Sequence, residues 1–599
     1  MLRPDDRTVA VELLRPPEGY HLDFAALTTF SLDLEALLAL PLAVLAHSDG
    51  GVDELLGDPL LLLEALRRAG DRVHVFVDVG RIAIPRVPRA LYAMLESSVH
   101  PVRAPHGGAF HPKVWVARFE SEGQPPLLRV AVLSRNLTFD RSWDVALATE
   151  GSPAGKRRVA ASRPLGELLR VLPQLATVPL PEPVAASLLA LAEQAERTSF
   201  PAPDGFDDPV TFHLLGASGA RRRPWKPQAG GSRVLAIAPF VNKTALQAVA
   251  EMSGGEHALV ARQEELDEVS PEVLADWDPI LVLEDAAVDE PEDETSTRPS
   301  GLHAKVIAIE HGWDVTWYVG SANLTAAAFT GTNVEMMVSV SGRKGRKSGQ
   351  SGQGIDRFLE SGFLGLCKRY QGGREQPRAL EVAEARSRLE QARDLLATAT
   401  LRVVCAPAEQ DWTWTLEGEL TLPEDVGITV WPVTLPEEHA RGLELPSRWS
   451  LPTPRLTAFV ALCLRVPVPG VDDIRMTLKV PARGMPEGRI SQILRTLIDS
   501  PERLLRFLRA LLGGLDGMVD WARAEGDGSE AGPWKSWLGG ETLLEDLVRV
   551  ASRQPSRLVP VRRLIEDLRS TEQGRTIVPD ELLAIWMAVE AALDQGVSS

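Results

Sequence analysis

Two short stretches of the chain each carry a histidine and a lysine two residues apart, followed further along by an asparagine. These residues are His111, Lys113 and Asn136 in the first stretch, and His303, Lys305 and Asn323 in the second. Imidazole titrates near neutral pH and can act as a nucleophile or an acid. A lysine supplies positive charge and an asparagine amide donates hydrogen bonds. Together these groups suit the cleavage of an anionic diester, which needs a nucleophile, a proton for the leaving oxygen and donors to the remaining oxygens.

The two stretches belong to a longer repeat with a fixed order. In both, an apolar strand-like segment and a hairpin follow the lysine, and the hairpin ends in Ser134-Arg-Asn-Leu-Thr138 or Ser321-Ala-Asn-Leu-Thr325. Another apolar strand comes next. Such a repeat indicates duplication of one α/β unit. Two facing units would place both histidines, lysines and asparagines around one phosphorus, and the hydroxyls of Ser134 and Ser321 are expected to add hydrogen bonds to it.

Strands and helices alternate around these motifs, which predicts an α/β layered fold. The segments His74–Gly80, Val114–Phe119 and Leu128–Ser134 have the composition of buried strands, whereas Leu32–Ala46 and Leu60–Gly70 have that of helices. The pattern returns from about residue 230. We therefore expect two duplicated halves forming a pseudo-twofold core, over residues 1–185 and 186–345.

The rest of the chain reads differently. A glycine- and serine-rich basic linker begins after Val340, and residues 346–400 are assigned to this linker and a helix. Residues 401–485 alternate with the period of two that is typical of strands, and residues 486–599 have the periodicity of helices. No catalytic constellation occurs there, and contact with a protein partner is the expected role of this region.

Length and composition limit the number of domains, the mode of nucleic-acid binding and the cellular compartment. The chain has 599 residues, room for about three domains. Its net charge of −18 means that any nucleic-acid binding must be local. Three widely spaced cysteines fit neither a disulfide framework nor a zinc site and favour a reducing cytoplasm. The N-terminus lacks the pattern of a signal peptide, and Leu32–Ala46 is too short to cross a bilayer.

Local basic clusters are the candidate nucleic-acid contacts. In each half one cluster begins 20 residues after the asparagine, and a third cluster combines charge with an aromatic ring that suits stacking on a base. The clusters are Lys156, Arg157 and Arg158; Arg343 and Lys344, with Arg346 and Lys347; and Arg221, Arg222, Arg223, Trp225 and Lys226. An acidic run, Asp289–Glu294, is either a solvated loop or a cover that competes with substrate for the basic site.

The order H-x-K, strand, S-x-N over about residues 20–345 resembles the phospholipase D superfamily. The resemblance implies a covalent phosphohistidine intermediate and no metal or other cofactor. By family precedent His111 is the nucleophile and His303 the acid and base. The aspartate that the family often has five residues after the lysine is replaced by Arg118 and Glu310. Its loss is closer to the tyrosyl-DNA phosphodiesterase branch and several nuclease branches than to the lipid-cleaving one.

The family's downstream carboxylate is matched by Glu335, which is expected to orient an imidazolium. The aligned position of the first half holds Ala146, with Glu150 four residues on. A carboxylate in only one half predicts different roles for the two histidines.

These observations favour a metal-independent nuclease acting on DNA or RNA, with DNA preferred. Bacterial phospholipase D-like proteins of similar layout occur in phage-defence or restriction systems, where a helicase or ATPase delivers DNA, so such a partner is expected by analogy. One alternative is a phospholipase or phosphatidyltransferase, which would need an interfacial helix that the sequence does not show. Another is a non-catalytic scaffold that binds protein partners.

Overall fold

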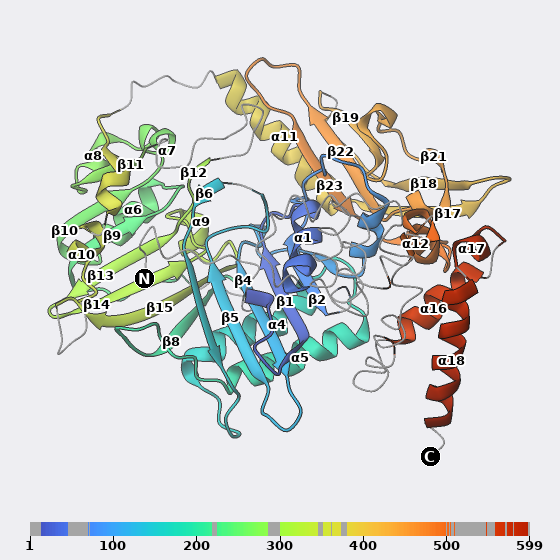
Figure 1. The fold of residues 1–599 in the computed structure, drawn as a ribbon. Coiled ribbons are helices and arrows are strands. Elements are labelled where there is room, and N and C mark those ends of the chain that lie inside the picture. The colour runs from blue at the N-terminus through green and yellow to red at the C-terminus, as the bar shows by residue number, and fades with distance from the viewer. Residues whose placement is uncertain are drawn as a thin grey trace, which may run out of the picture.

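The computed structural model describes most of the chain (Figure 1). The described residues are 13–45, 70, 72–139, 141–217, 224–284, 300–345, 352–360, 362–372, 380–423, 425–498, 500–501, 503–504, 508, 547, 558–569, 572–578 and 580–596. Most of the helix predicted at Leu60–Gly70, the cluster Arg221–Arg223, the acidic run Asp289–Glu294, and Arg346 with Lys347 therefore lie outside them. Within the described part of the chain, no helix is long and apolar enough to cross a membrane.

The first half is built on a six-stranded sheet in the order β3-β2-β1-β4-β5-β7. The strands are β1 (His21–Thr29), β2 (Val73–Asp78), β3 (Val99–Val102), β4 (Val114–Glu120), β5 (Leu127–Leu133) and β7 (Ala146–Gly151). β1, β2 and β3 are parallel, and β4, β5 and β7 continue the sheet antiparallel. All six residues of β2 are buried, as expected for a parallel strand covered on both faces.

The second half repeats this arrangement in an eight-stranded sheet with the order β16-β11-β10-β9-β13-β14-β15-β8. The strands are β8 (Phe206–Leu215), β9 (Gly231–Ile237), β10 (Ser253–Val260), β11 (Ile280–Leu283), β13 (Val306–His311), β14 (Asp314–Gly320), β15 (Glu335–Arg343) and β16 (Cys367–Arg369). The order β11-β10-β9-β13-β14-β15 matches β3-β2-β1-β4-β5-β7 strand for strand. This confirms the predicted fold class of two duplicated α/β halves.

The second half extends further along the chain than residue 345. β16 pairs antiparallel with β11 at the edge of the second sheet, and α10 (Ile355–Glu360) precedes it. β15 itself runs to Arg343, three residues into the segment expected to be linker.

A shared core joins the two halves. α4 (Arg163–Leu175) buries Leu165, Leu168, Leu169 and Leu172, the spacing of one helical face, and α5 (Glu182–Glu196) packs beside it. These leucines pack in one cluster with residues of both sheets. The other face of the second sheet is covered by α6 (Lys243–Ala250), α7 (Gln263–Asp267), α8 (Pro271–Leu274) and α9 (Ala326–Phe329).

The C-terminal region covers the corresponding face of the first sheet, together with α1 (Leu34–Leu45). It comprises α11 (Leu380–Thr398), two four-stranded sheets, and α12 (Arg489–Leu497), α16 (Leu558–Arg569), α17 (Glu572–Ile577) and α18 (Asp580–Gly596). The sheet strands are β17 (Thr400–Pro407), β18 (Trp412–Glu419), β21 (Ser447–Leu451) and β24 (Ala482–Arg483) in one, and β19 (Gly427–Pro432), β20 (Arg441–Gly442), β22 (Phe459–Arg465) and β23 (Ile474–Lys479) in the other. One apolar cluster contains residues of the first sheet and of both four-stranded sheets. Figure 1 shows this C-terminal region in orange and red beside the first half. This region is therefore an integral layer of the fold.

Candidate active site

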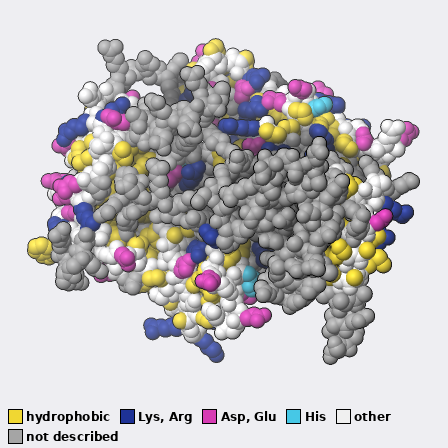
Figure 2. All heavy atoms as spheres, in the orientation of Figure 1, with side chains coloured by type: hydrophobic (Ala, Val, Ile, Leu, Met, Phe, Trp, Pro, Cys, Tyr) yellow, Lys and Arg dark blue, Asp and Glu magenta, His cyan; other side chains and the backbone are white. Residues whose placement is uncertain are grey.

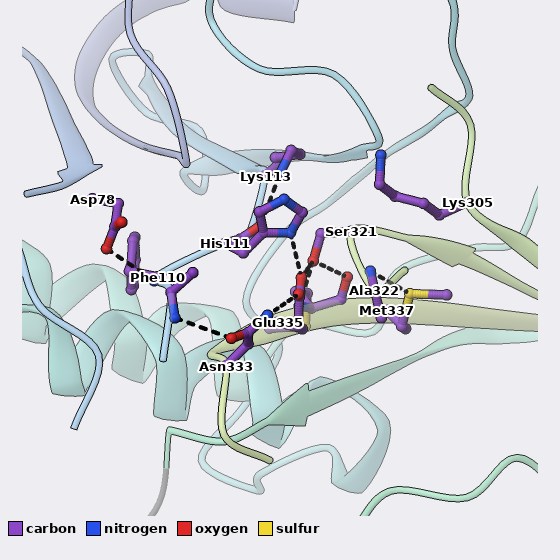
Figure 3. A network of polar contacts seen from close by, with 12 residues as sticks. Asp78, Phe110, His111, Lys113, Lys305, Ser321, Ala322, Asn333, Glu335 and Met337 are labelled. Carbon is purple, nitrogen blue, oxygen red and sulfur yellow. Dashed lines mark hydrogen bonds and ion pairs between the residues drawn. The ribbon is translucent and has the colours of Figure 1, made fainter. Parts of the chain in front are cut away.

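The two histidine–lysine pairs lie directly before the first residues of two equivalent strands, β4 and β13. Lys113 lies directly before β4 and Lys305 directly before β13, and both side chains are almost completely buried. Each ammonium group donates to the main-chain carbonyl of its own histidine, at 3.0 Å for His111 and 2.6 Å for His303. Burying a cation is costly, so two buried ammonium groups facing one site indicate a place kept for an anion. Figure 3 shows Lys113 and His111 together, with Lys305 approaching from the other half.

Each histidine is held against the opposite half by main-chain hydrogen bonds. The amide of His111 donates to the carbonyl of Val334 at 2.9 Å, and the amide of His303 donates to the carbonyl of Trp143 at 3.0 Å. The second contact continues a short parallel pairing of β12 (Ser300–Leu302) with β6 (Arg141–Trp143). Each histidine thus arrives beside the residue that follows Val334 or Trp143, namely a carboxylate.

Those carboxylates are exchanged between the halves. Nδ1 of His111 lies 2.8 Å from Glu335 Oε2, and Nδ1 of His303 lies 3.0 Å from Asp144 Oδ1. The expectation that only the second half has a carboxylate was therefore wrong. In the sheets Ala146 pairs with Leu133 as Met337 pairs with Gly320, which makes Asp144 the counterpart of Glu335.

A difference in loop length concealed this match. The carboxylate follows its serine by 10 residues in the first half and by 14 in the second. Matching Asp144-Val-Ala146 to Asn333-Val-Glu335 by sequence sets Ala146 opposite Glu335 and therefore misses Asp144. Glu150, considered as a substitute, pairs instead with Arg129 on β5 at 2.5 Å.

The two serines hold the carboxylates. Ser134 Oγ donates to Asp144 at 2.9 Å, and Ser321 Oγ donates to Glu335 at 2.5 Å. Each hydroxyl oxygen also accepts a main-chain amide, from Val145 and from the residue after Glu335 respectively. The single hydroxyl proton is already used, so the expected donation to phosphate is not the arrangement found. Ser134 and Ser321 act as positioning residues.

A second polar contact fixes the other oxygen of each carboxylate. Ser142 Oγ donates to Asp144 Oδ2 at 3.0 Å, and Asn333 Nδ2 donates to Glu335 Oε1 at 3.4 Å. Asn333 Oδ1 also accepts the amide of Ala109, close to His111 (Figure 3). Asp144, Ser142 and Asn333 were not predicted from the sequence. The sequence feature that could have identified them is their position, because polar residues occur directly before β7 in the first half and before β15 in the second.

The asparagines of the motif carry matching unsatisfied atoms. The side-chain oxygens of Asn136 and Asn323 are buried, and neither has a hydrogen-bond partner within the described part of the chain. Buried polar atoms without partners are rare in folded proteins. Their occurrence at the same place in both halves is a further match between the two half-sites.

Burial and charge set the protonation of the site. Burial lowers the pKa of His111 to about 4, with Lys113 acting in the same direction and Glu335 against it. Burial also lowers the pKa of His303 and that of Lys113. For Glu335 burial alone would raise the pKa, but the charge and hydrogen bond of His111 outweigh it.

Asp144 behaves in the same way. Burial opposes its ionisation, yet the hydrogen bond and charge of His303 hold its pKa below the ordinary value. An ionised carboxylate only accepts hydrogen bonds, so each imidazole must present Nδ1–H to it. Nε2 of each ring then carries the lone pair, which is the state required of a nucleophile or a base.

The positions that hold the family's aspartate have structural roles here. Arg118 forms an ion pair with Asp23 and contacts Gln194. Glu310 accepts the amide of Ile355 at 2.9 Å, at the start of α10. Both lie five residues along the strand from their lysine, so neither belongs to the site.

The basic clusters of the two halves lie away from the histidines. Glu335 begins β15 and Arg343 ends it, which separates them by about 26 Å at the rise of a strand. Arg343 pairs with Asp314 at 2.7 Å and Lys344 lies 3.9 Å from Glu310. In the first half the cluster follows the far end of β7 (Ala146–Gly151).

The described members of the other clusters are also placed. Arg158 pairs with Glu196 at 3.1 Å, while Lys156 and Arg157 are exposed. Trp225 packs against His213, Tyr318 and Phe329, and Lys226 beside it is exposed. Figure 2 shows acidic and basic side chains interspersed over the face that it presents. The clusters that follow β7 and end β15 are not brought to the histidines, and the binding of nucleic acid by any of the clusters stays a prediction.

The crossed carboxylates make a testable prediction. Asp144→Asn and Glu335→Gln will each lower kcat by about 10²- to 10⁴-fold, because an amide can stabilise the wrong imidazole tautomer and cannot balance its charge. Steady-state hydrolysis of a chromogenic phosphodiester measures the effect. Glu150→Gln is the matched control and will retain activity. Equal activity of the Asp144 and Glu150 variants would show that Asp144 has no part in the reaction.

No family model matches the chain, and no curated protein matches it. Among solved structures it is similar to the yeast tyrosyl-DNA phosphodiesterase, with 12% identity over 58% of this chain and 89% of that chain and a TM-score of 0.32. A mutant of the same yeast enzyme gives 12% identity, 57% and 88% coverage, and the same TM-score. A TM-score this low establishes no shared function, so the function of this chain has to be inferred from the geometry of its two half-sites.

Proposed function

We propose that the chain is a phosphodiesterase with one composite active site, and that it cleaves nucleic acid without a metal ion. The observation that carries this proposal is the pair of imidazoles, each hydrogen-bonded to a buried carboxylate of the opposite half. Two buried lysines beside them supply positive charge for a phosphate. This set provides a nucleophile, a proton donor and charge stabilisation from protein groups alone.

The proposed hydrolysis has two steps, the formation and the hydrolysis of a phosphohistidine. Nε2 of His111 attacks phosphorus and forms a P–N bond, while the bond to the leaving oxygen breaks and His303 gives that oxygen a proton. Water then attacks the phosphohistidine, His303 takes its proton, and the P–N bond breaks to release a phosphomonoester. The bound anion favours protonation of His303, because negative charge beside an imidazole stabilises its charged form. Lys113 and Lys305 neutralise charge on the oxygens that do not react.

A nucleic-acid strand is the proposed substrate because further cations flank the histidines. Arg262 Nε donates to the carbonyl of Leu302, the residue before His303, at 3.0 Å. The guanidinium of Arg81 lies 4.7 Å from the ring of Phe30, which itself packs 4.9 Å from the ring of His111. Cations on both sides of the site suit a substrate with phosphates on both sides of the scissile one. A role in phage defence with a helicase or ATPase partner remains a prediction from the resemblance.

End-labelled single- and double-stranded DNA and RNA, incubated with the full chain in EDTA, test this function. Cleavage that persists in EDTA and is lost in the His111→Ala/His303→Ala variant is the expected result. A phospholipid and a chromogenic phosphodiester are included as alternative substrates. Hydrolysis of the lipid alone would replace the nuclease by a phospholipase, and hydrolysis of none would favour a scaffold.

The pH dependence of kcat/KM will reveal the neutral nucleophile. Activity will fall as pH falls through a limb set by His111, whose pKa is lowered from 6.5 to about 4 by burial. Glu335→Gln will move this limb to still lower pH, because the negative charge of Glu335 raises the pKa of His111. Rates over a pH series at subsaturating substrate measure it. An acidic limb at the ordinary histidine value would contradict the assignment.

A further inference from the structure

An aromatic ring is exposed at the catalytic end of the second half. Phe240 lies in the loop between β9 and α6, and its side chain is 39% exposed. Its carbonyl accepts the amide of Leu324 at 3.2 Å, directly after Asn323 of the motif. The guanidinium of Arg262 lies 5.3 Å from the centre of its ring. Arg262 also donates a hydrogen bond to the carbonyl of Leu302, the residue before His303. Arg262 therefore contacts both the Phe240 ring and the segment that carries His303.

This exposure is unusual for the molecule. Among the large apolar side chains that the structure describes as exposed, only Phe240 and Trp313 are aromatic. Trp313 sits in the turn between β13 and β14, at the end of these strands opposite to His303. Keeping a phenylalanine ring in water forgoes part of the stabilisation that its burial would give. A ring left open beside a reactive site therefore points to a ligand.

The first half has a related pair whose aromatic ring is less exposed. Phe30 follows β1 as Phe240 follows β9, and Arg81 follows β2 as Arg262 follows β10. The ring of Phe30, however, packs against His111 at 4.9 Å and lies 5.7 Å from the ammonium of Lys113. Phe30 thus belongs to the wall of the site, whereas Phe240 presents its ring to solvent. The duplicated halves differ at this point.

We propose that Phe240, with Arg262 over its ring, is a stacking platform for one base of a single-stranded nucleic acid, next to the scissile phosphate on the His303 side. This rests on the proposed function and adds the strandedness of the substrate. Aromatic rings stack on any base and so bind single strands without sequence preference. A base inside a duplex is already stacked and paired, so only an unpaired region or end can use the platform. Arg262 meanwhile offers its charge to the adjoining backbone.

Binding by a chain that cannot turn over tests this directly. In a His111→Ala background, Phe240→Ala will weaken affinity for a fluorescent single-stranded oligonucleotide roughly 5- to 150-fold, the range expected for losing one stacked base. Phe240→Tyr will keep the affinity because the ring is kept. Trp313→Ala, the matched exposed aromatic, will change nothing. An oligonucleotide with abasic sites across the bound segment will bind more weakly, and Phe240→Ala will not weaken its binding further.

The readout needs no cleavage, so it stays informative if the proposed hydrolysis fails. Weaker binding by Phe240→Ala without any cleavage would support the platform and reject the enzyme. Unchanged affinity of Phe240→Ala would overturn the platform even if the chain is a nuclease. An equal loss on the abasic strand, duplex binding as tight as single-strand binding, or no oligonucleotide binding at all would overturn it as well.

Discussion

Replacing His111 with alanine will lower kcat for phosphodiester hydrolysis by about 10⁴-fold or more, the scale seen when a nucleophile is removed from a coupled catalytic set. The variant cannot form the P–N bond, so no radiolabelled phosphoenzyme will accumulate. His303→Ala will also lose turnover. With a good leaving group that needs no proton, however, it will still form the phosphoenzyme and hydrolyse it slowly. Acid-quenched, rapidly mixed reactions separate the two cases.

His439, an exposed histidine of the C-terminal region, supplies the control for this comparison. His439→Ala will keep full turnover. Labelling of the His111→Ala chain but not of His303→Ala would reverse the two roles. Absence of label in every variant, with turnover intact in the parent chain, would exclude a covalent intermediate.

Replacing Glu96 with alanine will lower the free energy of unfolding by about 3–5 kcal/mol, the cost of breaking a buried ion pair from one side. Glu96 follows the short helix 90–95 of the first half and pairs with Arg489 of α12 at 2.8 Å, with both side chains nearly buried. It also accepts the amide of Ala458 and the hydroxyl of Thr457. The substitution leaves the Arg489 charge in the interface without its partner. Equilibrium unfolding in urea measures the loss.

Glu437→Ala is the matched control, since its ion pair with Arg475 is about half exposed. Its loss will be roughly 0–1 kcal/mol. If both variants lost the same small amount, the contact between the first half and the C-terminal region would contribute little to stability. The C-terminal region would then be an appended domain rather than a layer of the fold.

The repeat in the sequence was sufficient to predict the duplicated fold and the meeting of His111 and His303. Strict spacing survives where residues lie in one short segment directly before a strand, as in H-x-K. It fails across loops, and Asp144 was missed because it follows its serine by 10 residues whereas Glu335 follows its serine by 14. The basic clusters show that equal spacing does not imply a place in the site. Both clusters begin 20 residues after the asparagine, but β7 and β15 lead away from the histidines.

The position of the C-terminal region could not be predicted from the sequence. Its contacts with the first half join residues far apart in the chain, such as Thr477, which donates its amide to the carbonyl of Ile82 at 2.7 Å. Pairings of this kind leave no periodic signal in either segment. The amphipathic strands of residues 401–485 did indicate a face that must be buried, but not the surface that buries it.

The exchange of carboxylates also bears on how the activity arises during synthesis. His303 finds its carboxylate in Asp144 and His111 finds its own in Glu335, so neither half contains a complete imidazole–carboxylate pair. A nascent chain that ends before His303 has neither pair, and one that ends before Glu335 lacks the pair of the proposed nucleophile. If the proposed activity is correct, we expect a nascent chain to be inactive while its first half folds beside the ribosome. Under the proposed function, both imidazole–carboxylate pairs form only when the second half docks on the first, so the activity would depend on completion of the fold.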